Sequence, residues 1–123
     1  MKLKELRPMI WTNELNETVD FYTSVLGFTC GAFREDLGWA AFHRDDVEFM
    51  AAKPNAHTPF EKPLFTGSFY INTDDVNKLW LELKDKCKLC YPIDDFEHGM
   101  REFAIYDNNG YLIQFGQDLE EIK

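Results

Sequence analysis

Gln114 is the polar residue whose place in the sequence most clearly suggests a chemical role. It lies in the segment REFAIYDNNGYLIQF, residues 101–115, between Ile113 and Phe115. Successive side chains of a strand point to opposite faces, so Gln114 faces away from its two apolar neighbours. An amide in that position either contributes to a metal site or hydrogen-bonds a guest or a neighbouring side chain in a cavity that holds no metal.

The cysteines carry less weight as chemical groups. Cys87 and Cys90 form a C-x-x-C motif, but the motif closes a predicted helix. A redox pair normally opens a helix, where the dipole stabilises the thiolate. A zinc site would need a second pair, and Cys30 is the remaining thiol. We therefore expect the cysteines to be structural.

Strand and helix signals occur in the same order in both halves of the chain. In the first half, residues 7–12 predict a strand, 13–28 predict a helix, and the hairpin within 39–52 turns at 44–46. The proline-rich loop 53–63 follows. In the second half, 67–72 predict a strand, 74–87 a helix with Asp74 or Asp75 as its cap, and 101–117 a hairpin that turns at 108–110.

Each half has about sixty residues, which is too few to bury a sizeable core alone. We therefore expect a single domain, 1–123, made of one module at about 5–53 and another at about 64–118.

Composition limits the classes of partner. The net charge is −9, from 13 basic and 22 acidic residues, which argues against nucleic acid and anionic membranes and suits a cationic ligand. Aromatic residues make up 15% of the chain, enough to build a cavity for flat apolar groups as well as a core. The sequence has no apolar run of spanning length and an odd number of cysteines, so we expect a cytoplasmic protein.

Two segments carry a family resemblance. TNELNETVDFYTSVLGF and REFAIYDNNGYLIQF resemble the signatures of the vicinal oxygen chelate superfamily, which includes glyoxalase I, extradiol dioxygenases and bleomycin resistance proteins. RPMIWTNELNETVDFY and GWAAFHRDDVEFMAA are most similar to the bleomycin resistance proteins. The resemblance implies proteins that are not enzymes, sequester a cationic, flat-ringed antibiotic at a dimer interface, and exchange their N-terminal strand between subunits.

The resemblance also implies where a metal would bind. Metal-using members place one ligand on each of four strands, and the matching positions here are Arg7, Glu48, Ser68 and Gln114. A guanidinium stays protonated and cannot ligate, and a serine hydroxyl is a poor ligand. Glu48 and Gln114 alone are too few, while His43 is expected to face away from Glu48, and His57 and His98 to lie in loops. We expect no metal and no other cofactor, with Gln114 bonded to Arg7, to Glu48 or to a ligand.

Aromatic residues are expected to line a cup around these polar groups. Strand alternation puts Trp11 on the face of Arg7, and Tyr70 on the face of Ser68. In the resistance proteins, the rings that sandwich the drug fall at Phe33, Trp39 and Tyr70, although core or dimer contacts would also explain aromatic residues there. One departure is Gly99, which stands where the resistance proteins have a tryptophan.

These observations lead to an α+β fold of two paired βαβββ modules, whose curved mixed sheets surround a cavity, with the helices outside and N-terminal strand exchange in a homodimer. The expected function is sequestration of a small aromatic or cationic molecule, as in antibiotic resistance. Phe33, Trp39, Tyr70 and Trp11 would contact it, and Glu48, Gln114 and Arg7 would orient it. The alternative is a metal-dependent lyase or dioxygenase of the glyoxalase I type, and a third option is a dimeric interaction module.

Overall fold

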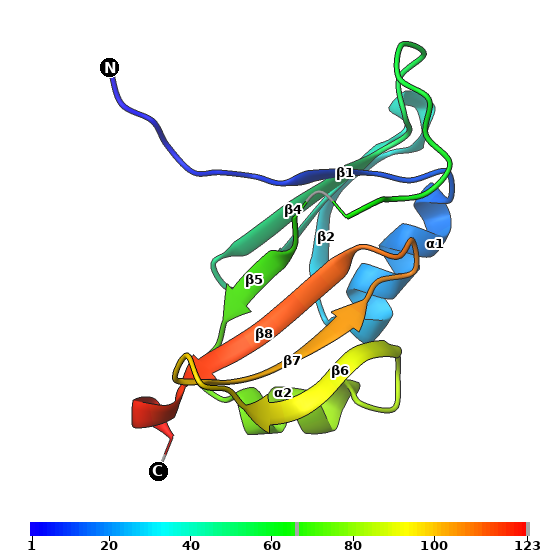
Figure 1. The fold of residues 1–123 in the computed structure, drawn as a ribbon. Coiled ribbons are helices and arrows are strands. Elements are labelled where there is room, and N and C mark those ends of the chain that lie inside the picture. Colours follow the sequence, from blue (N-terminus) through cyan, green and yellow to red (C-terminus); the bar gives the residue numbers. More distant parts are fainter. Residues whose placement is uncertain (66, 123) are drawn as a thin grey trace. The chain divides into compact units, whose positions relative to one another are not determined.

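The computed structural model describes residues 1–65 and 67–122, and the chain divides into two compact units, Met1–Lys62 and Pro63–Lys123. The first unit contains β1 (Met9–Trp11), α1 (Leu15–Asp20), the π-helical turn η1 (Phe21–Val25), β2 (Thr29–Arg34), the 3-10 turn η2 (Glu35–Leu37), β3 (Trp39–Arg44) and β4 (Val47–Ala52). The second contains β5 (Phe69–Asn72), α2 (Val76–Leu83), β6 (Lys88–Asp95), β7 (Met100–Tyr106), β8 (Leu112–Asp118) and the 3-10 turn η3 (Leu119–Glu121) (Figure 1).

Each unit is a four-stranded mixed sheet with the same topology. The strand order is β1-β4-β3-β2 in the first unit and β5-β8-β7-β6 in the second. In both, the first strand runs parallel to the last, and the other neighbours are antiparallel. The predicted α+β fold of two βαβββ modules is therefore confirmed. Strand exchange and the homodimer stay predictions.

A helix covers one face of each sheet. In the first unit, Tyr22 of η1 stacks on Phe42 with ring centroids 5.1 Å apart, and both rings are buried. In the second, Val76 and Leu83 of α2 are buried, and Trp80 packs edge-on against Phe103 at 5.2 Å. Burial of these apolar side chains is the main favourable term in folding each sheet onto its helix. α1 packs on β3 and β4, and α2 on β7 and β8, and each unit has no second α-helix among the described residues 1–65 and 67–122.

Local sequence explains where the helices begin and end. The backbone N–H of Lys78 donates to the Asp75 carboxylate at 3.1 Å, so Asp75 caps α2, as one of the two predicted residues. The first predicted helix is divided, because its last part forms the π turn, in which the Leu26 N–H donates to the Phe21 carbonyl. Gly27 follows with φ 73°, a left-handed conformation that glycine adopts without strain.

The sequence pattern does not predict strand β6. It is the edge strand of its sheet, it contains Pro92, and its pairing with β7 shifts register twice. Pro92 and the two consecutive acidic residues Asp94 and Asp95 weaken the alternating pattern by which strands are recognised. Across 1–65 and 67–122, no helix has the length and apolar character that crossing a membrane requires.

Candidate functional site

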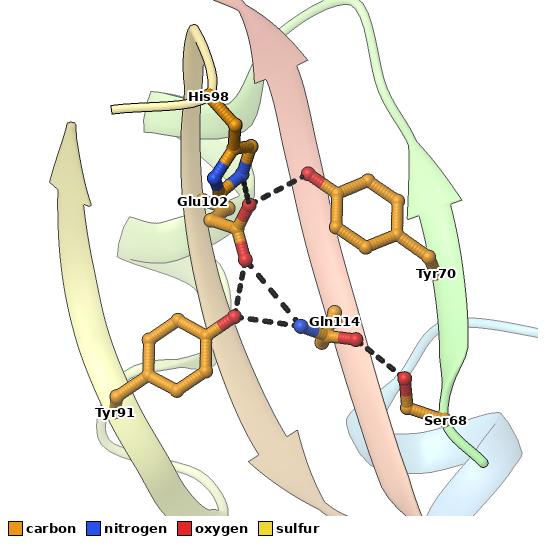
Figure 2. A network of polar contacts seen from close by, with 6 residues as sticks. All are labelled: Ser68, Tyr70, Tyr91, His98, Glu102 and Gln114. Atoms are coloured by element: carbon orange, nitrogen blue, oxygen red, sulfur yellow. Dashed lines mark hydrogen bonds and ion pairs between the residues drawn. The ribbon is translucent and has the colours of Figure 1, made fainter. Parts of the chain in front are cut away.

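The register of the second sheet gathers polar side chains on the face opposite α2. Tyr70 of β5 pairs with Gln114 of β8, which puts both side chains on one face, and Gln114 pairs with Ala104 of β7. Ala104 in turn pairs with Tyr91 of β6, and Glu102 lies two residues before it on the same face. Figure 2 shows the resulting Glu102 cluster, which consists of Ser68, Tyr70, Tyr91, His98, Glu102 and Gln114.

Glu102 is the centre of the cluster. Its Oε1 accepts a hydrogen bond from the Tyr70 hydroxyl at 2.9 Å and lies 2.6 Å from Nε2 of His98. Its Oε2 accepts from the Tyr91 hydroxyl and, more weakly at 3.4 Å, from the Gln114 amide. The Glu102 side chain is only 4% exposed. A buried carboxylate is costly unless it is paired and hydrogen-bonded, and this one has partners at both oxygens.

The Gln114 amide is oriented by its neighbours. Its Oε1 accepts from the Ser68 hydroxyl at 2.5 Å, and its Nε2 donates to the Tyr91 hydroxyl at 2.9 Å. Tyr91 therefore accepts from Gln114 while donating to Glu102, which makes a continuous chain from Ser68 to the carboxylate. The sequence suggests Arg7, Glu48 or a ligand as the partner of Gln114, whereas its side chain bonds to Ser68, Tyr91 and Glu102.

Gly116 lets the Tyr70 side chain reach Glu102. The Tyr70 ring extends from β5 across β8 toward the carboxylate (Figure 2). A Cβ atom on Gly116 would lie 2.0 Å from the Tyr70 hydroxyl oxygen and 2.7 Å from Cζ. No real Cβ makes such a contact, so any side chain at 116 forces Tyr70 to move. The missing side chain of Gly116 is what allows the contact between Tyr70 and Glu102.

Burial and hydrogen bonding act in opposite directions on the pKa of Glu102. Burial raises it, but the hydrogen bonds from Tyr91, His98 and Tyr70 together hold the pKa of Glu102 below its ordinary value. Burial and the bond to Glu102 outweigh the opposing bond from Gln114 and raise the pKa of Tyr91 to about 12. Burial and the same carboxylate also raise the pKa of Tyr70. At neutral pH the cluster is a carboxylate held by two protonated phenols.

Acid is expected to destabilise the protein through Glu102. Because the folded-state pKa is lowered, the unfolded chain binds the proton more readily, so the stabilisation is complete above the ordinary carboxyl pKa of about 4.3. It is lost as the pH falls through the depressed pKa of the folded state. Urea denaturation at a series of pH values between neutrality and the acid limit measures this loss. A free energy of unfolding that stays constant throughout that range would contradict it.

The first unit pairs two of the other predicted residues. Arg7 Nε donates to Glu48 Oε2 at 2.8 Å, and Arg7 also forms an ion pair with Glu5 at 2.9 Å. Both Arg7 and Glu48 are substantially exposed, at 48% and 38% of their side chains. Trp11 lies on the Glu48 face, as predicted, because it pairs with Ala52. Its ring meets Phe60 edge-on at 5.8 Å.

The position predicted for His43 was wrong. The hairpin register pairs His43 directly with Glu48, so both side chains lie on the same face of the first sheet. The three-residue turn expected at 44–46 is a two-residue turn, since Arg44 pairs with Val47. One residue fewer in the turn moves His43 from one face to the other relative to Glu48.

Phe33 and Trp39 lie on opposite faces of the first sheet. Phe33 pairs with Ala40, which is fully buried under the helix, whereas Trp39 pairs with Ala52 on the Glu48 face. Phe33 is nonetheless 39% exposed, at the end of β2. Two rings on opposite faces of one sheet cannot sandwich the same flat molecule within that unit. Gly99, at the family's tryptophan position, has φ 89°, which would strain any larger residue.

The four family ligand positions do not fit a metal ion. Arg7 is cationic and paired with Glu48, and the Ser68 hydroxyl is used by Gln114. Within 1–65 and 67–122, no three His, Cys, Asp or Glu side chains are grouped so that they could hold an ion. Arg7 and Glu48 form an ion pair in the first unit, and Ser68 and Gln114 form a neutral hydrogen bond in the second.

Comparison with known proteins agrees with this architecture. A family model described as the Glyoxalase/Bleomycin resistance protein/Dioxygenase superfamily matches residues 6–115. The chain belongs to this superfamily. The family resemblance drawn from the sequence is therefore confirmed. No curated protein matches this chain.

Solved structures share the superfamily fold at low identity. TnmS3, an antibiotic binding protein from Streptomyces sp. CB03234, has a TM-score of 0.78 and 17% identity, over 96% of this chain and 98% of its own. TioX from Micromonospora sp. ML1 has a TM-score of 0.73 and 16% identity, over 94% and 99%. A lactoylglutathione lyase from Agrobacterium tumefaciens has a TM-score of 0.68 and 13% identity, over 93% and 92%. Identities this low establish the fold alone.

Three residues of the Glu102 cluster were missed from the sequence, namely Tyr91, His98 and Glu102. Tyr91 was missed together with β6. Glu102 had a readable signal, because it is an acidic residue inside the predicted strand REFAIY, directly before the apolar run FAI, and a buried charge needs a partner. His98 is in the turn predicted for it, but its ring returns to the sheet.

Proposed function

We propose that this protein binds and sequesters a small aromatic or cationic molecule without transforming it. The observation that carries the proposal is the exposed Tyr70 ring beside a buried anionic carboxylate on a sheet face that has no helix of its own unit. Tyr70 is 39% exposed, and its hydroxyl bonds to Glu102. An aromatic face next to a negative charge favours flat groups and cations over anions.

The acidic balance of the chain and one solved structure support this proposal. A net charge of −9 attracts cations over a range set by ionic strength. TnmS3, which shares the fold, is an antibiotic binding protein. Antibiotic resistance is the biological role that we propose for such binding. Gln114 would orient the ligand on the second sheet. In the first unit the proposed contacts are Trp39, Trp11 and Glu48 on one face of the sheet, Arg7, which precedes β1 and pairs with Glu48, and Phe33 on the other face.

A thermal-shift screen with bleomycin-type drugs, other cationic antibiotics and divalent metals tests the proposal. Saturating a site at one hundred times its dissociation constant stabilises the folded protein by about 2.7 kcal/mol, which is readily detected. A drug response without a metal response is the expected result. No response to any drug would contradict sequestration, and a stoichiometric metal lost on Glu48→Ala would favour the lyase or dioxygenase instead.

Replacing Tyr70 with alanine is expected to weaken binding of a responding drug about tenfold, because one aromatic contact contributes roughly 0.5–1.5 kcal/mol beyond its buried area. Calorimetric titration of the folded variant gives the dissociation constant. Leu81→Ala is the matched control, since Leu81 is a large apolar side chain, 66% exposed, on α2. Equal dissociation constants for the two variants would remove Tyr70 from the ligand site.

A further inference from the structure

His98 occupies an unusual place for a side chain on a turn. Its side chain is 58% exposed, yet Nε2 lies 2.6 Å from the carboxylate of Glu102, which is 4% exposed. The ring is nearly parallel to that of Phe96, with centroids 5.7 Å apart and an interplanar angle of 25°. The imidazole therefore contacts a carboxylate at one end and an aromatic ring at one side, and we call the position that it occupies between Glu102 and Phe96 the slot.

The other groups that contact Glu102 are neutral, so a positive charge beside this carboxylate would have to come from the slot. Tyr70, Tyr91 and Gln114 are neutral donors to the carboxylate. Among the described contacts of Glu102, His98 is the group that can become a cation. Arg101, the residue before Glu102 in β7, lies on the other face of the sheet and is held by Asp95 at 2.7 Å and by Asn77. A buried carboxylate whose other donors are neutral favours a cationic donor at this position.

The walls of the slot are held independently of His98. Phe96 packs edge-on against Tyr91 at 5.5 Å, and Tyr91 and Tyr70 fix the two oxygens of Glu102. The turn between β6 and β7 is closed by backbone bonds, from Gly99 N–H to the Phe96 carbonyl and from Phe96 N–H to the Met100 carbonyl. His98 can thus rotate into solvent by changing its side-chain rotamer while the turn and the walls remain in place.

We propose that the slot between Glu102 and Phe96 binds a flat nitrogen ring that carries a positive charge, and that His98 fills the slot until such a ligand displaces it. The inference rests on the proposed binding function and names the chemical group that this face recognises. The ligand ring donates an N–H to Glu102 Oε1, stacks on Phe96 as the imidazole does, and supplies the compensating charge. A bulky aliphatic ammonium ion lacks both the flat face and the in-plane donor.

Imidazole itself is the probe for this slot. At about pH 6 imidazole is mostly protonated, because its pKa is close to that of a histidine side chain. The His98→Ala variant is expected to bind imidazole with a millimolar dissociation constant, seen as a thermal shift and as amide chemical-shift changes around Phe96 and Glu102. His57→Ala is the matched control, since it removes an exposed histidine from the loop of the other unit. Tetramethylammonium chloride at equal concentration controls for charge and ionic strength.

The slot requires both of its walls. Adding Phe96→Leu or, separately, Glu102→Gln to His98→Ala is expected to reduce imidazole binding at least several-fold. The Phe96 variant keeps the test valid if the Glu102 variant does not fold. Equal responses of His98→Ala and His57→Ala, or equal responses to imidazole and tetramethylammonium, would overturn the proposal.

This experiment separates the slot from the proposed function, because it uses no drug. Imidazole binding by His98→Ala together with a flat drug screen would support the slot and contradict drug sequestration. A drug response without imidazole binding would support sequestration and overturn the slot.

Discussion

Replacing Glu102 with glutamine is expected to lower the free energy of unfolding by about 2–3 kcal/mol, because hydrogen bonds to a charged group contribute roughly 1.5–3 kcal/mol each. The amide keeps the shape of the carboxylate but offers one acceptor oxygen and one NH2 group. Oε1 now accepts from Tyr70 and lies beside His98, and Oε2 accepts from Tyr91 and Gln114. In either orientation of the amide, its NH2 group therefore faces side chains that donate to the carboxylate oxygen it replaces, and those hydrogen bonds are lost. Guanidinium chloride denaturation at neutral pH measures the change.

The same substitution at Glu48 is the control. Glu48 forms an ion pair with Arg7, but its side chain is 38% exposed. Exposed ion pairs contribute about 0–1 kcal/mol, so Glu48→Gln is expected to cost less than about 1 kcal/mol. If the two variants lose equal stability, the hydrogen bonds of the Glu102 cluster contribute no more than a surface ion pair, and the cluster does not stabilise the second sheet.

Replacing Gly116 with alanine is expected to cost about 2 kcal/mol, through Tyr70 rather than through the backbone, because a hydrogen bond to a charged group is lost. The added Cβ would lie 2.0 Å from the Tyr70 hydroxyl oxygen, and that ring, being 39% exposed, can turn into solvent. Glu102 then loses one donor at Oε1. Urea denaturation gives the loss of stability, and the Tyr70 ring resonances report its displacement.

A double-mutant cycle distinguishes this cause from a general intolerance of side chains at 116. In a Tyr70→Ala background the clash is absent, and alanine is better than glycine inside a strand by about 0.5–1 kcal/mol. The sign of the Gly116→Ala effect is therefore expected to reverse. A cost of similar size in both backgrounds, with no coupling between the two positions, would show that Tyr70 does not depend on Gly116.

The sequence contained most of the fold because its local signals agree with the final structure. Leu15, Tyr22 and Leu26 recur at helical spacing and are buried, as are Val76 and Leu83 of α2. The turn at 108–110 forms where Asn-Gly predicts it, with the Asp107 carboxylate accepting from the N–H groups of Asn109, Gly110 and Tyr111. These features depend on neighbours within a few residues, so a pattern in the chain records them.

The site was harder to predict because it depends on register between strands. One residue in the length of the β3–β4 turn decided whether His43 shares a face with Glu48. The bulged, proline-containing β6 concealed Tyr91. Glu102 meets Tyr70 across β8 only because position 116 lacks a side chain. Alternation puts Tyr70 on the face of Ser68, but it gives no information about which groups pair across the four neighbouring strands β5, β8, β7 and β6.

Pro92 has a further consequence for behaviour in concentrated solution. β6 is eight residues long and is an edge strand of its sheet. Its outer backbone groups could therefore pair with a strand of another molecule. Pro92 has no amide donor to offer to a further strand, and the two register shifts of β6 depart from the flat, regular pairing that amyloid-like stacking needs. We therefore expect the irregularity of β6 to weaken self-templated strand addition along this edge.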